Sequence, residues 1–121
     1  MQITRVHMGN AGESHFEDLE VPLLEGRYGA ISEFWPLSGV AFRVTQPRAE
    51  LDFHNAPRRQ FVVTLEGLAE IECARGETRR FGPGDILLAD DVDSHGHITR
   101  EIEGPRRSLF LALDPNFGSG L

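Results

Sequence analysis

Short apolar runs that alternate with polar residues recur along the chain, and turn-forming residues separate them. Runs of this length that are rich in Val, Ile, Phe and Leu are typical of β-strands, and their regular spacing is typical of a sandwich or a barrel. The predicted strands are ITRVHM, SGVAFRVTQ, QFVVTLEG, LAEIECA, GDILLAD, HGHITREI and SLFLALD. The pattern therefore predicts an all-β fold.

Glycine and proline predict where these strands end. Gly67 lies between FVVTLE and LAEIECA, so we expect a hairpin reversal there, and a second reversal at RGETRR. The tripeptide GPG at 82–84 breaks the chain before the next apolar run, because proline fixes φ and glycine permits the turn. In GESHFEDLEVPL, Ser14 is placed to cap about one helical turn, which Pro22 ends.

Length, composition and charge restrict the classes of function. A chain of 121 residues without a linker or a repeat is expected to fold as one domain. With 12 basic and 19 acidic residues its net charge is −7, which repels phosphate backbones and anionic membranes, so we predict no nucleic-acid and no membrane partner. No apolar run approaches the roughly 20 residues of a membrane span, and the start lacks a secretion pattern, so a cytoplasmic location is expected.

Two consecutive segments carry a recognisable pair of motifs. HNAPRRQFVVTLEGLAEIE contains His54, Gln60 and Gly67, and ETRRFGPGDILLADDVDSHGH contains the pair Gly-Asp at 84–85 followed by His95. In order and spacing they resemble cupin motif 1 (about 52–67) and motif 2 (about 82–99). With GESHFED near the start, nearly the whole chain is similar to small single-domain bacterial cupins. The resemblance implies one domain over 1–121, folded as a double-stranded β-helix (jelly-roll barrel), with a flexible tail at about 115–121.

The resemblance also implies a possible metal centre. Cupins place motif histidines at the barrel mouth, where His54, His95 and His97 would supply up to three nitrogen ligands to zinc, iron, nickel or manganese. Which of His95 and His97 matches motif 2 stays open, since His97 lies two residues beyond the usual position. Ala56 replaces the second motif-1 histidine and Gln60 the glutamate, which removes a nitrogen donor and the anionic ligand. Asp52, Asp90 or water would then complete the site, and a metal-free site is equally open.

Strand alternation extends this candidate site. Asp52 and His54 share one strand face, as do His95 and His97, so these side chains can face a common interior. His54 and His97 are candidate catalytic groups, because an imidazole transfers protons near neutral pH.

Three further side chains are candidate substrate ligands. Arg43, and Arg58 of the pair 58–59, can bind a carboxylate through two hydrogen bonds. Gln60 can hydrogen-bond a ligand or orient an imidazole.

Other residues have structural explanations. Cys73, the single cysteine, lies in a strand-like stretch and is expected to be a small buried hydrophobe. The aspartates of ADDVD (Asp90, Asp91, Asp93) are expected to form a solvated acidic turn, with a cation site as the alternative. The aromatic residues Phe34, Trp35, Phe42, Phe53 and Phe61 are expected in the core or in an interface.

Two main hypotheses for the function follow. The first is an enzyme that acts on a small organic acid or carbonyl compound in the barrel pocket, with or without a metal. The alternative is a non-catalytic cupin that binds a small ligand in a pocket whose metal site has degraded. A structural subunit of a larger complex is a third possibility. In each case the free edge of a sheet needs to be covered, so we predict a homodimer.

Overall fold

The computed structural model describes residues 1–9, 11–47, 50–54, 58–92 and 96–117, and for 50–54 it describes the backbone only. The predicted all-β class is confirmed, because the described chain is built from strands and one short 3₁₀ turn and forms a single small domain. The elements are β1 (Gln2–Met8), β2 (Ser14–Glu20), β3 (Leu24–Gly26), β4 (Gly29–Ile31), β5 (Leu37–Thr45), β6 (Glu50–His54), β7 (Gln60–Glu72), η1 (Ala74–Gly76), β8 (Thr78–Phe81), β9 (Ile86–Asp90) and β10 (His97–Leu113).

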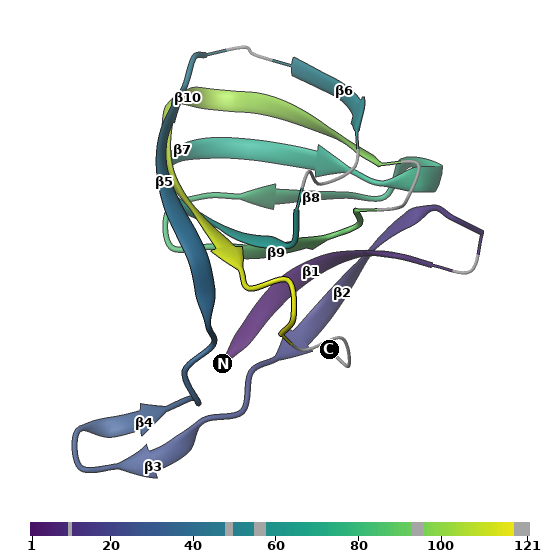
Figure 1. Cartoon of the computed structure of the whole chain (residues 1–121). Coiled ribbons are helices and arrows are strands. Elements are labelled where there is room, and N and C mark those ends of the chain that lie inside the picture. The colour runs from purple at the N-terminus through teal and green to yellow at the C-terminus, as the bar shows by residue number, and fades with distance from the viewer. Residues whose placement is uncertain (10, 48–49, 55–57, 93–95, 118–121) are drawn as a thin grey trace.

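Eight strands form one sheet in the order β2-β1-β9-β7-β10-β5, with β6 added beside β10 and β8 beside β7. The β1 and β9 strands are parallel, and the other neighbours are antiparallel. Figure 1 shows this sheet curling around an interior, while the separate hairpin β3–β4 projects away from it. The curl gives the sheet an inner and an outer face.

The two longest strands, β7 and β10, pair with each other and bend together at the position of Gly67 in β7. The predicted hairpin at Gly67 is therefore wrong, since β7 continues to Glu72. A Cβ at Gly67, where φ is +87°, would lie 2.7 Å from the carbonyl oxygen of Glu103 and 2.9 Å from Cα of Arg106. The glycine thus permits a close crossing of β10, and the β7–β10 register shifts beside it.

The predicted helical turn after Ser14 is also wrong. Residues 14–20 form β2, which pairs antiparallel with β1 from Met8↔Ser14 to Gln2↔Glu20. Alternate side chains of this strand, Ser14 and Phe16, are buried. An isolated helical turn is marginal in water, so strand pairing and the burial of Phe16 outweigh one favourable cap.

The other turn predictions are confirmed. RGETRR joins β7 to β8 through η1, and these two strands pair antiparallel. The segment 82–84 joins β8 to β9, where the Asp85 carboxylate accepts a hydrogen bond of 2.8 Å from the backbone N–H of Gly82.

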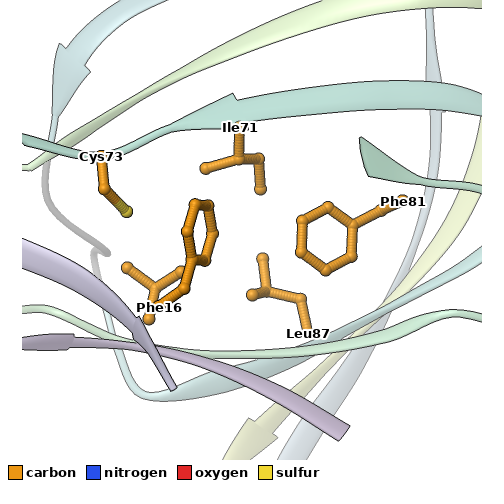
Figure 2. Close-up of a cluster of buried hydrophobic side chains, with 6 residues drawn as sticks. Phe16, Ile71, Cys73, Phe81 and Leu87 are labelled. Carbon is orange, nitrogen blue, oxygen red and sulfur yellow. The ribbon is translucent and has the colours of Figure 1, made fainter. Parts of the chain in front are cut away.

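Two apolar clusters lie on the two faces of the sheet. The inner cluster contains Val6, Phe16, Ile71, Cys73, Phe81 and Leu87, whose side chains converge between the strands in Figure 2. The outer cluster contains Ile3, Val21, Leu88 and Leu113, with Leu19, Trp35, Phe61, Ile86 and Phe117 packed against it. Cys73 is 1% exposed, which confirms its prediction as a buried hydrophobe.

The described end of the chain packs on the outer cluster. The rings of Trp35 and Phe117 lie 5.3 Å apart, and Arg59 Nη1 donates a hydrogen bond of 2.6 Å to the carbonyl oxygen of Phe117. Residues 118–121, the rest of the predicted flexible tail, lie outside the described residues.

Candidate functional site

A buried acid–imidazole pair lies at the start of β10. His97 Nδ1 is 2.6 Å from Asp91 Oδ2, and the side chains are 6% and 0% exposed. Asp91 follows β9 by one residue and continues the alternation Leu87, Ala89, Asp91, which directs it to the inner face. The sheet therefore brings together a carboxylate and an imidazole that are six residues apart in sequence.

A third side chain completes this cluster. Ser14 Oγ, fully buried at the start of β2, donates a hydrogen bond of 2.7 Å to Asp91 Oδ2. Burial by itself raises the pKa of Asp91, but the hydrogen bonds from His97 and Ser14 and the charge of His97 outweigh it and hold this pKa below the ordinary value. Asp91 is therefore a carboxylate at neutral pH, and it fixes the proton of His97 on Nδ1.

The neighbouring aspartate has a different role. Asp90 points to the outer face, where Arg5 Nη2 lies 2.6 Å from Oδ2 and Arg59 Nε 2.9 Å from Oδ1. The Asp90 side chain is 10% exposed. These contacts join β1, β9 and the segment before β7, so Asp90 is placed away from the interior in which a metal ligand was predicted.

The predicted solvated turn is thus wrong for both aspartates. Asp91 and Ser14 are the functional candidates that the sequence interpretation missed. The available signal was the alternation Leu87, Ala89, Asp91, which already placed Asp91 on the face of the strand's buried residues.

Gln60 lies on the same inner face, at the start of β7. It pairs with Ala89 of β9 and Ala112 of β10 and is 5% exposed. Its Oε1 atom is buried and has no hydrogen-bond partner within the described part of the chain. A buried amide oxygen normally requires a donor, so Gln60 is able to accept a hydrogen bond from a bound molecule.

Arg43 also belongs to the inner face. It lies opposite Ser108, which in turn lies opposite Thr64, so the three form a polar row across β5, β10 and β7. The guanidinium of Arg43 is exposed and lies 5.4 Å from the centre of the Phe110 ring. Arg58 is exposed beside the start of β7, whereas its neighbour Arg59 is bound to Asp90.

A buried ion pair occupies the inner face near the bend. Arg106 Nε donates a hydrogen bond of 2.7 Å to Glu101 Oε1, with the side chains 9% and 1% exposed. Arg106 Nη1 lies 3.5 Å from the Thr64 hydroxyl. The sequence interpretation did not identify this pair, because Arg106 shares the inner face with Glu101 only after the bend shifts the alternation of β10.

The structure describes some of the predicted metal ligands completely and others only in part or not at all. The backbones of His54 and His97 are register partners between the antiparallel strands β6 and β10. The side chains of His54 and Asp52 lie outside the described residues, as do His95, Ala56 and Asp93. Among the side chains that are described, no three of His, Cys, Asp and Glu are grouped to hold a metal ion.

Comparison with known proteins adds no family assignment: no protein-family model matches the chain, and no curated protein matches it at a significant level. The described residues contain no helix long and apolar enough to cross a membrane.

Proposed function

We propose that this protein is a cupin-like, small-molecule protein whose inner face binds a small organic acid or carbonyl compound, with His97 as the reactive imidazole. The observation that carries the proposal is the buried Asp91–His97 pair, in which 2.6 Å separates the carboxylate from Nδ1. An imidazole whose tautomer is fixed by a carboxylate is the arrangement used for proton transfer and for metal ligation. With Nδ1 bound to Asp91, the reactive nitrogen in either role is Nε2.

The remaining inner-face side chains support an acidic ligand. Arg43 supplies a guanidinium suited to a carboxylate, and the Gln60 amide oxygen supplies a buried acceptor for a hydroxyl or an N–H group. Each of them would bind one group of a ligand on the face that they share with His97, the proposed proton-transfer group. Positioned general acid–base catalysis of this kind contributes about 10²- to 10⁴-fold in rate.

The donor set fits a divalent metal in part. His97 would hold the ion and Asp91 would orient the His97 ring, while His54 is in backbone register with His97 on the neighbouring strand β6. A bound zinc, iron, nickel or manganese ion would supply Lewis-acid chemistry at the same place. Gln60 at the position of the cupin glutamate provides no charge to offset the ion, so any such site depends chiefly on imidazole nitrogens.

A second candidate function rests on that same substitution. Gln60 is neutral and buried, which favours binding of a polar ligand without turnover, in a pocket that has lost its anionic metal ligand. This non-catalytic function predicts ligand-dependent stabilisation with no product.

The test begins with purification without chelator and without exposure to affinity-tag metal. Elemental mass spectrometry then compares the wild type with His54→Ala, His97→Ala and the control Asp90→Asn. Near-stoichiometric metal that is lost in both histidine variants and kept in the control would support metal-dependent chemistry. Absence of metal after reconstitution would contradict it and leave the metal-free alternatives.

A thermal-shift screen of small organic acids and carbonyl compounds separates catalysis from binding. We expect a stabilising ligand whose effect is lost in Arg43→Ala and Gln60→Leu. Chromatography of that ligand after incubation then detects or excludes a product. Stabilisation that persists unchanged in both variants would contradict the proposed site.

A further inference from the structure

Exposed apolar side chains are concentrated on the β3–β4 hairpin, the segment after it and the outer side of β5. Tyr28 and Phe34 are each 92% exposed, and Phe42 is 81% exposed. The aliphatic members of this surface are Leu24, Ile31, Leu37, Val40 and Val44, with exposures between 45% and 67%. We call these eight residues the arm surface, and exposed apolar surfaces of this extent mark interaction sites.

The residues of strands β3 and β4 are not buried against the large sheet. Every residue of β3 and β4 is exposed, and Figure 1 shows the hairpin standing away from the large sheet. A two-stranded hairpin alone in water is marginally stable at best. Its conformation therefore requires a surface on which Leu24, Tyr28 and Ile31 can be buried.

The strand β5 also has an uncovered edge and exposed apolar side chains. It ends the sheet, so one of its edges has no neighbouring strand within the described chain, and Val40, Phe42 and Val44 project from its outer side. Beside it, an open apolar groove of about 290 Å³ is lined by Phe34, Trp35, Phe61, Val63, Ile86 and Leu111, among others. An exposed apolar edge of this kind is normally covered.

We propose that a second copy of this chain covers the arm surface, with the β3–β4 hairpin of each copy lying on β5 of the other. A dimer with two-fold symmetry would cover both surfaces, because each chain carries a β3–β4 hairpin and also the strand β5 on which the hairpin of the other copy lies. The arm surface is large enough for a stable dimer interface. Its three exposed aromatic side chains would bury about 500 Å² per copy, and the aliphatic residues bring this area toward the roughly 800 Å² per partner of a standard interface.

Charge favours a second copy over a partner of opposite charge. The chain as a whole carries −7, which opposes self-association. The segment 24–45 contains two acidic residues, Glu25 and Glu33, and two basic residues, Arg27 and Arg43, so its net charge is zero. The repulsive charge lies elsewhere, and the arm surface can face its own copy without a like-charge penalty.

Light scattering coupled to size exclusion, at 5 to 100 µM protein, tests the proposal. The wild type is expected at twice the 13.5 kDa of one chain. Phe42→Glu on β5 and Tyr28→Glu in the hairpin should each raise the dissociation constant at least about 30-fold, since both place a charge in the centre of the interface. The control Met8→Glu, at a residue 45% exposed at the far end of β1, should leave the dimer intact.

Circular dichroism distinguishes loss of the dimer from loss of the fold, and Phe42→Ala replaces any variant that unfolds. A cysteine pair then tests the arrangement itself, in a Cys73→Ala background. Tyr28→Cys combined with Phe42→Cys should give a covalent dimer on a non-reducing gel, and Tyr28→Cys combined with Met8→Cys should not. A monomeric wild type at 100 µM, or a dimer unaffected by both glutamate variants, would overturn the proposal.

Discussion

The Nδ1 atom of His97 lies 2.6 Å from Oδ2 of Asp91, and neither side chain is accessible to solvent to any appreciable extent. A hydrogen bond of this length to a charged acceptor is among the strong ones. It determines which nitrogen of the imidazole can react, and for this reason the relationship can be tested before any ligand is known.

We predict that His97 carries a proton on Nδ1 at neutral pH. In ¹⁵N-edited NMR spectra the Nδ1–H signal of His97 should persist because the site is closed to water, and Asp91→Asn should broaden or shift it. Asp90→Asn changes the adjacent carboxylate on the opposite face and should leave it unchanged. A neutral wild-type ring protonated on Nε2 would contradict this assignment.

The ion pairs of Asp90 are expected to stabilise the fold. Asp90→Asn removes the carboxylate shared by Arg5 and Arg59, which are 14% and 18% exposed, and leaves Arg5 only the longer 3.7 Å ion pair with Glu17 among its described partners. Loss of one member of a largely buried pair costs on the order of 3 kcal/mol of unfolding free energy. Urea denaturation measures this loss.

The matched control for Asp90→Asn is Glu66→Gln. Glu66 pairs with Arg107 at 2.7 Å on an exposed surface, with side chains 60% and 55% exposed. Solvent screens such a pair, so its loss should cost under about 1 kcal/mol. Equal costs for the two variants would show that burial does not determine the contribution of Asp90.

The class of fold was predictable from the sequence because strand alternation and turn residues are local signals. The positions of β1, β5 and β9, and the break at 82–84, followed from them. The bend at Gly67 did not, since a glycine with positive φ is compatible with a hairpin or with a bulge. The choice depends on the crossing of β10 at Glu103 and Arg106, which are distant in sequence.

The site was predictable to a similar degree. Gln60 was identified from its motif position and His97 from its place two residues beyond one, and both are buried on the inner face. Asp91 and Ser14 were missed because their roles arise from a contact between β2 and the end of β9, 77 residues apart. Alternation could have shown that Asp91 faces inward, but only the folded sheet brings Ser14 to it.

Glycine substitutions can separate the crowding at Gly67 from its backbone strain. Gly67→Ala combines a positive φ of +87° with contacts under 3 Å to β10, so we expect a loss well above 1 kcal/mol in unfolding free energy. Gly84→Ala has a similar φ of +89° but open space around the new Cβ, so it should cost about 1 kcal/mol. Gly39→Ala, in a strand and without contacts, should be neutral or slightly stabilising. A Gly67→Ala loss no larger than that of Gly84→Ala would exclude the close crossing.

Cys73 makes stability depend on alkaline pH. Burial, followed by the charges of Asp91 and Glu77, raises the pKa of its thiol from 9.0 to about 12. Below pH 9 the thiol is protonated in the folded and unfolded chains, so its contribution is fully present. Between pH 9 and 12 the unfolded chain releases the proton and the folded chain keeps it, so stability falls by up to about 1.4 kcal/mol per pH unit.

This dependence can be isolated in the present chain. It contains no lysine, and Tyr28 is its single tyrosine, so Cys73 and Tyr28 are the side chains that ordinarily titrate in this range. Urea denaturation from pH 8 to 11 should show a steep decline in the wild type and in Tyr28→Phe, and a shallower one in Cys73→Ala. Because the thiolate is the nucleophile, alkylation of the folded protein at pH 8.5 should also be much slower than in urea. Rapid alkylation of the native thiol, or parallel pH curves for Cys73→Ala and the wild type, would show that the thiol is not closed off beside Asp91.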